Sequence, residues 1–92
     1  MQEVIEKYAA ACGFSFEEII GTSRRLELSL VRQLIWKKLR DSMVSCSELA
    51  RLFNRRSRSG IIHGVRRVGG LLEIGDRKTL EYQKRMDDVQ NP

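Results

Sequence analysis

The 92-residue sequence predicts a small all-α domain of five to six helices. Three observations favour this fold. Apolar residues recur at helical spacing along most of the chain, which is typical of amphipathic helices. The only proline is Pro92, and no Gly/Ser-rich linker interrupts the chain. The length is that of one domain, so residues 1–92 are expected to form a single unit.

The first two helices are predicted over residues 2–12 and 16–20. An apolar stripe along the first ends at Cys12, which we expect to be a small core residue rather than half of a disulfide. Gly13 can take the left-handed conformation that ends a helix. Ser15 offers a hydroxyl to cap the second helix.

The third helix, predicted over residues 26–42, is the expected centre of the core. It carries an apolar face at helical spacing, formed by Leu28, Leu30, Val31, Leu34, Ile35 and Leu39. Arg32, Trp36 and Arg40 form a separate row that can carry charge along the flank of this helix. Trp36 is expected to be a packing residue rather than a platform for bases.

Three further helices follow. Ser45 and Glu48 match a capping box, in which each side chain accepts a backbone N–H of the other, at the start of a helix over 46–53. Ser57 can cap the next helix, predicted to reach residue 72 with Ile61, Val65 and Val68 inward. The last helix, from residue 76 to about 90, has a thin apolar stripe and is expected to pack only peripherally.

The positive charge is concentrated in the middle of the chain. The net charge is +5, from 17 Lys and Arg against 12 Asp and Glu. Residues 24–67 carry twelve basic and three acidic side chains, a charge of +9, whereas residues 1–23 carry −3 and residues 68–92 carry −1. A basic block of this kind favours a polyanionic partner.

Residues 45–68 have the pattern of a helix-turn-helix, with a turn at 54–56 and a recognition helix over 57–72. Arg58 and Ser59 at its tip are the best candidates to read base edges in the major groove. Phosphate contacts are expected of the other arginines on and near this unit, namely Arg40, Arg55, Arg56, Arg66 and Arg67. His63 is either a contact or an exposed residue without a role.

An ordered series of short segments adds a family resemblance. The series is Phe14-Ser15-Phe16-Glu17-Glu18-Ile19-Ile20-Gly21, Arg24, Arg32-Gln33, Ser45-Cys46-Ser47-Glu48-Leu49-Ala50-Arg51-Leu52-Phe53, Arg56 and Ile61-Ile62-His63-Gly64-Val65-Arg66-Arg67-Val68. Over residues 4–68 the chain resembles the C-terminal DNA-binding domain of DnaA, the bacterial chromosomal replication initiator. That domain is all-helical and belongs to the Trp-repressor-like helix-turn-helix group.

The resemblance implies sequence-specific binding to double-stranded DNA. It implies that Arg24, with Arg25, forms an arm in the minor groove, unless the two are simply a solvated pair. It also implies phosphate contacts from Arg32, Gln33, Arg40 and the segment from Ser45 to Ser47. The full set of expected DNA contacts is Arg24, Arg25, Arg32, Gln33, Arg40, Ser45, Ser47, Arg55, Arg56, Ser57, Arg58, Ser59, His63 and Arg67.

The chain also departs from the family. The recognition helix begins Arg56-Ser57-Arg58-Ser59-Gly60 where the family has Arg-Asp-His-Thr-Thr. We therefore expect a DNA sequence different from the initiator's usual site. No ATPase domain is present in these residues, so initiator activity in the full sense is not expected.

Other functional classes find little support in the sequence. There is one histidine, and no phosphate-binding loop, activated nucleophile or converging carboxylate pair, so we expect no catalysis, cofactor, metal or small-molecule substrate. Neither a signal peptide nor a membrane span is encoded, which favours the bacterial cytoplasm. The alternative to DNA binding is a protein-interaction module whose basic face docks an acidic partner.

Overall fold

The computed structural model describes residues 1–90, with side chains to Val89, and within this range the chain is all-helical and contains no strand. Its six helices are α1 (Gln2–Ala11), α2 (Phe16–Ile20), α3 (Leu26–Asp41), α4 (Cys46–Leu52), α5 (Ser59–Glu73) and α6 (Arg77–Gln90). The predicted fold class is confirmed. Among these helices, none has the length and apolar character needed to cross a lipid bilayer.

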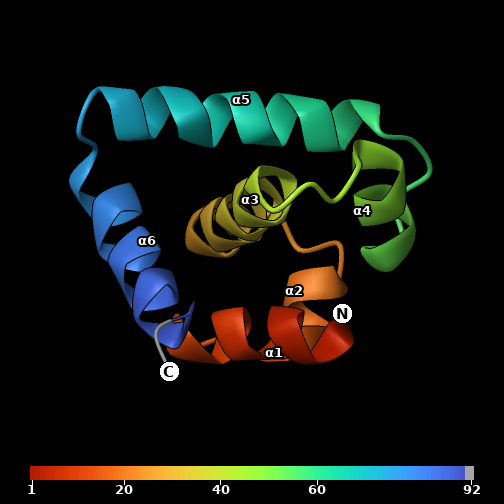
Figure 1. Ribbon diagram of the computed structural model, residues 1–92, viewed down its shortest axis with the longest axis horizontal. Coiled ribbons are helices and arrows are strands. Elements are labelled where there is room, and N and C mark those ends of the chain that lie inside the picture. The colour runs from red at the N-terminus through yellow and green to blue at the C-terminus, as the bar shows by residue number, and fades with distance from the viewer. Residues whose placement is uncertain (91–92) are drawn as a thin grey trace.

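Helix α3 lies at the centre of the domain, as predicted. It contacts α1, α2, α5 and α6, and the other helices surround it (Figure 1). Helix α5 passes along one side of α3, and α1 lies on the opposite side (Figure 1). The apolar face of α3 is buried, with Val31 and Ile35 fully excluded from solvent.

Four helices end in the same way, with a left-handed residue after the helix. Gly13 (φ 85°) follows α1, as predicted, and Gly75 (φ 74°) follows α5. The same position is taken by Met43 (φ 73°) after α3 and by Asn54 (φ 54°) after α4. In each case the next residue's N–H bonds back to a carbonyl in the last turn, for example Arg55 N to Ala50 O at 2.7 Å.

The helix starts differ from prediction at two places. The Ser45 hydroxyl accepts the N–H of Glu48, but the Glu48 side chain pairs with Arg51, so only half of the predicted capping box forms. A complete capping box forms instead at Ser15. The predicted cap at Ser57 is wrong, because α5 begins at Ser59 behind Arg58, which makes no side-chain cap.

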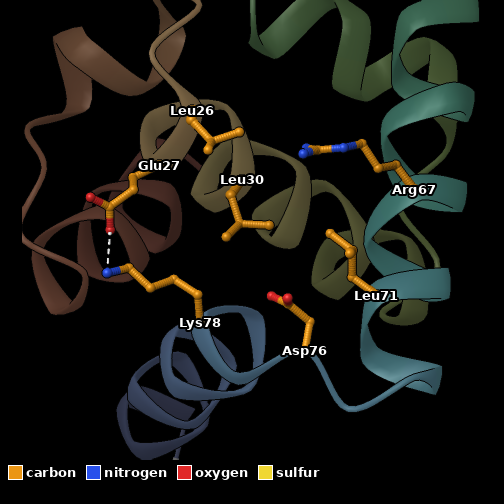
Figure 2. A pocket seen from close by; sticks show the side chains of 7 residues that line it. All are labelled: Leu26, Glu27, Leu30, Arg67, Leu71, Asp76 and Lys78. Atoms are coloured by element: carbon orange, nitrogen blue, oxygen red, sulfur yellow. Dashed lines mark ion pairs between the residues drawn. The ribbon is translucent and has the colours of Figure 1, made fainter.

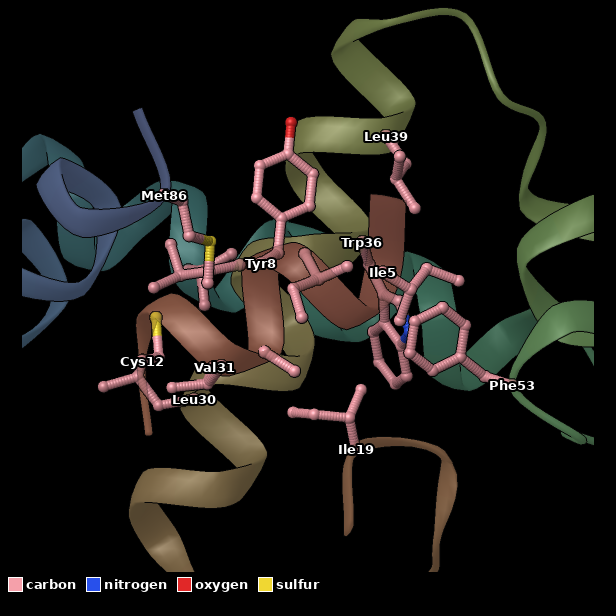
Figure 3. Close-up of a cluster of buried hydrophobic side chains, with 14 of the residues drawn as sticks. Ile5, Tyr8, Cys12, Ile19, Leu30, Val31, Trp36, Leu39, Phe53 and Met86 are labelled. Carbon is pink, nitrogen blue, oxygen red and sulfur yellow. The ribbon is translucent and has the colours of Figure 1, made fainter. Parts of the chain in front are cut away.

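Helix α6 belongs to the core, and the expectation that it packs peripherally is wrong. Met86 is completely buried, and it lies among core side chains of the other helices (Figure 3). Helix α6 contacts α1, α3 and α5, so a thin stripe suffices because three helices cover it. Polar contacts also hold it, since Tyr82 donates to Glu27 at 2.6 Å and Lys38 pairs with Asp87.

Helix α5 passes close to α3 at Gly64. An added Cβ at Gly64 would stand 2.6 Å from the six-membered ring of Trp36. Trp36 is buried and meets Phe53 edge-on, with ring centroids 5.7 Å apart, which confirms its packing role (Figure 3). Cys12 is also a buried core residue with a free thiol, as expected, and burial raises its pKa to about 11.

Candidate nucleic-acid interface

The outward face of α5 is polar and exposed. Ile61, Gly64 and Val68 are buried against the domain. The side chains on the other face of the helix are exposed, namely those of Ser59, His63, Arg66 and Arg67. The predicted orientation of α5 is therefore confirmed, and it follows from the 100° turn per residue of an α-helix.

Residues 53–58 connect α4 to α5, and this connection is longer than the predicted three-residue turn. Arg56, Ser57 and Arg58 lie in it and are exposed, immediately before the first turn of α5. Within residues 1–90, no ion pair engages Arg56 or Arg58. This end of α5 therefore presents two cations together with the positive end of the helix dipole.

The acidic residues of α4 and α5 are Glu48 and Glu73, and they lie on either side of a long stretch of sequence without any. Residues 49–72 contain six arginines and no Asp or Glu. The one ion pair that these arginines form in the described part of the chain is that of Arg51 with Glu48. A phosphate backbone approaching this stretch would meet cations and hydroxyls, with the nearby carboxylates Glu48 beside Arg51 and Asp76 beside Arg67.

The expected contacts at the start of α4 lie close together in the chain and are exposed. Arg40 donates to the carbonyl of Val44 at 2.9 Å, in the α3–α4 connection. Ser45 acts as the N-cap of α4 and Ser47 is exposed in its first turn. A phosphate contact by these three residues remains a prediction.

Gln33 and Arg67 meet each other. Arg67 of α5 donates to the side-chain oxygen of Gln33 on α3 at 2.7 Å. The sequence predicted one DNA contact for Gln33 and another for Arg67. The hydrogen bond joins the two helices and orients the Arg67 guanidinium across the surface toward α3 (Figure 2).

Arg32 is buried, and the expectation that it contacts phosphate is wrong. Its side chain is 5% exposed, although the row with Trp36 and Arg40 predicted an exposed flank. The guanidinium donates to the carbonyls of Ile19 at 2.7 Å, Ser23 at 3.0 Å and Glu18 at 3.1 Å. Burial lowers the pKa of Arg32, with a smaller effect from Arg55. All of these N–H groups donate to carbonyls at, or just after, the end of α2.

Arg55 is half-buried and also donates hydrogen bonds to carbonyls at the end of α2. The sequence did not predict this role. It donates to the carbonyls of Phe53 at 2.8 Å, Gly21 at 3.0 Å and Ile20 at 3.3 Å. Its guanidinium carbon lies 5.9 Å from the centre of a Trp36 ring. Burial lowers its pKa. Backbone carbonyls take three of its N–H donors, and the expected phosphate contact of Arg55 stays a prediction.

The arm expected at Arg24 and Arg25 is a segment between α2 and α3, and both side chains are exposed. Arg25 lies 3.6 Å from the carboxylate of Glu18, a weak pair because both groups face solvent. No hydrogen bond or ion pair within residues 1–90 engages the Arg24 side chain, which leaves it available for a ligand. Insertion into a minor groove remains a prediction.

A cleft of about 390 Å³ lies beside this surface, between α3, α5 and the start of α6 (Figure 2). Its lining is apolar at Leu26, Leu30 and Leu71, and charged at Arg67, Asp76, Glu27 and Lys78. Glu27 and Lys78 pair at 3.2 Å, and Asp76 accepts from Thr79. Residues 1–90 contain no cluster of three or more side chains that could hold a metal ion.

The chain matches no protein-family model, no curated protein and no solved structure. The resemblance to the replication initiator's DNA-binding domain therefore rests on the residues quoted above.

Proposed function

We propose that the protein binds double-stranded DNA, with α4 and α5 acting as a helix-turn-helix and α5 as its recognition helix. One observation carries the proposal. The outward face of α5 and the connection before it combine exposed arginines, serines and one histidine in a stretch of 24 residues, 49–72, without a single carboxylate.

An α-helix fits the major groove of B-form DNA. The exposed tip of α5 brings Arg58 and Ser59 to the end that would enter the groove first. Arginine makes paired hydrogen bonds to guanine, and serine can donate or accept at any base edge. We therefore assign base reading to these two residues, with His63 one turn further along the same face.

The surrounding cations fit contacts to the phosphate backbone. Arg56 lies just before the tip and Arg66 lies further along the exposed face of α5, whereas Arg40 is in the last turn of α3 and Ser47 in the first turn of α4. Such contacts position a protein on DNA without reading sequence, and they make affinity depend on salt. The segment of Arg24 and Arg25 supplies the minor-groove contact in this arrangement.

The DNA sequence bound differs from that of the initiator family in this proposal. Arg58 stands where that family has a histidine, and Ser57 stands where it has an aspartate. An arginine favours guanine, whereas an aspartate would accept from cytosine. The domain is thus proposed as a relative of origin-binding domains that reads another site.

Selection of duplexes from a random library, followed by fluorescence anisotropy, tests the proposal. We expect a preferred sequence bound below about micromolar at low salt. Arg58→Ala should lower discrimination at one base position, while Arg66→Ala should weaken all duplexes and reduce the salt slope by about one unit. Lys7→Ala is the control, because it removes the same charge from α1, opposite α5 (Figure 1).

Three results would contradict the proposal. The first is the absence of any duplex retained below about micromolar at low salt. The second is equal behaviour of Arg66→Ala and Lys7→Ala. The third is capture of one stoichiometric acidic protein without a shift on any duplex, which would favour the interaction module instead.

A further inference from the structure

Two arginines from different parts of the chain converge on the end of α2. Arg32, on α3, donates to the carbonyls of Glu18, Ile19 and Ser23. Arg55, in the connection before α5, donates to the carbonyls of Ile20 and Gly21. We call this set of two guanidinium groups and five carbonyls the carbonyl clamp.

The clamp joins the two segments proposed to touch DNA. Arg24 follows Gly21 by three residues, and Arg58 follows Arg55 by three residues. The hydrogen bond of Arg55 to Gly21 spans 34 residues of sequence at 3.0 Å. Only three peptide bonds therefore separate Gly21 from Arg24, and three separate Arg55 from Arg58.

The clamp is held by directed hydrogen bonds to carbonyl oxygens rather than by ion pairs with carboxylates. Within residues 1–90, no carboxylate pairs with Arg32 or Arg55. The two cations repel each other, which contributes to the lowered pKa of Arg32. Carbonyls at the end of a helix carry partial negative charge and lack partners inside the helix, so a guanidinium fork suits them.

Helix α2 depends on contacts such as the clamp for its stability, because its five residues are too few for a stable isolated helix. Its start is held by the capping box of Ser15, and its end is held by the clamp. Without Arg55, the carbonyls of Ile20 and Gly21 lose their link to the α4–α5 connection. The segment of Arg24 and Arg25 would then be held to α3 by Arg32, through Ser23, but would no longer be tied directly to the connection that leads to the tip of α5.

We infer that Arg55 is a positioning residue, which holds the Arg24–Arg25 segment and the tip of α5 in one register so that they engage a single duplex together. The inference rests on the proposed DNA binding. Arg55 is assigned no phosphate contact in this scheme, because three of its N–H donors already bind backbone carbonyls.

Proteolysis of the free protein tests the clamp without DNA. Trypsin cleaves after arginine, and we expect cleavage after the exposed Arg24 and Arg25 to become faster when this segment is held less firmly. Arg55→Lys keeps the charge, but its single nitrogen cannot reach the carbonyls of Phe53, Ile20 and Gly21 together. We expect cleavage there to accelerate about tenfold relative to cleavage after Lys84, the typical effect of losing a hydrogen bond to a charged group. An unchanged ratio would overturn the clamp.

A double-mutant cycle on the selected duplex tests the positioning role. We expect Arg55→Lys to weaken binding about tenfold in the natural chain, and less than about twofold once Arg24 and Arg25 are both alanine. Arg51→Lys, in the preceding helix and exposed, should change neither value. Equal weakening by Arg55→Lys in both backgrounds would overturn positioning, since Arg55 would then act directly on DNA or through general stability.

The two tests separate the clamp from the proposed function. If the natural chain binds no duplex, the proposed function and the positioning role both fail. The proteolysis result still decides whether Arg55 ties the Arg24–Arg25 segment to the domain. If duplex binding is normal and cleavage after Arg24 and Arg25 is unaffected by Arg55→Lys, the clamp and the positioning role are overturned while the proposed function stands.

Discussion

The crossing of α5 over α3 depends on the missing side chain of Gly64, and Gly64→Ala tests that dependence. The added Cβ would stand 2.6 Å and 2.7 Å from two ring carbons of Trp36 and 2.9 Å from Cγ of Gln33. These separations are far below the ~3.5–4.0 Å at which carbon atoms attract each other. Either the indole or the whole helix has to move.

The indole has little room to move. Trp36 is 5% exposed, meets Phe53 edge-on at 5.7 Å, and carries the Arg55 guanidinium 5.9 Å from its ring centre. Overpacking a core costs about 1–3 kcal/mol, and this rigid site belongs in the upper part of that range. The better helix propensity of alanine offsets about 1 kcal/mol of this overpacking cost. The expected net loss in the free energy of unfolding is about 1–2 kcal/mol.

Urea unfolding followed by circular dichroism at 222 nm measures this loss, and the same helix provides a matched control. A Cβ at Gly70 would meet no atom within 4 Å. Gly70→Ala should therefore raise the free energy of unfolding by about 0.5–1 kcal/mol. The two single-methyl changes are expected to have opposite signs. If Gly64→Ala proves as stable as Gly70→Ala, the close contact of α5 with Trp36 is refuted.

Three further predictions concern stability. Arg32→Met should cost about 3 kcal/mol in urea unfolding, because three carbonyls lose a charged donor, and a loss under about 1 kcal/mol would contradict the buried role of Arg32. Met86→Ala should cost about 2–5 kcal/mol in the same assay, since this side chain is fully buried, whereas a peripheral helix would lose far less. Burial and then the hydrogen bond to Glu27 raise the pKa of Tyr82 from 10.0 to about 12. Its stabilising contribution is therefore complete below pH 10 and is lost as pH rises toward 12, so Tyr82→Phe should reduce the fall in urea midpoint over that interval, and an identical fall in both proteins would exclude it.

Helical periodicity predicted the orientation of α5 correctly. The spacing of Ile61, Val65 and Val68 placed one side of the helix inward, and Ser59 and His63 are accordingly exposed. Val65 is only half-buried, and the buried position between Ile61 and Val68 is Gly64. Periodicity assigns faces reliably because it depends on local geometry, but it does not reveal where a neighbouring helix comes closest.

Along α3 the same reasoning predicted the buried apolar face correctly but failed at Arg32. Arg32, Trp36 and Arg40 share a row, yet only Arg40 is exposed. The row fails because α2 and the α4–α5 connection cover its first two members. The sequence alone does not distinguish a buried arginine from an exposed one. The carbonyls that accept hydrogen bonds from Arg32 lie nine to fourteen residues earlier in the chain, outside the helix whose periodicity was used.

The sequence by itself determined the all-helical class, most helix ends and the concentration of positive charge, because these follow from spacing, capping and composition along the chain. Only the tertiary structure decided which cations remain exposed. It buried Arg32, half-buried Arg55, left Arg56, Arg58 and Arg66 exposed, and packed α6 into the core. The physical reason is that burial and hydrogen bonding of a side chain depend on atoms distant in sequence, such as the Gly21 carbonyl that Arg55 reaches across 34 residues.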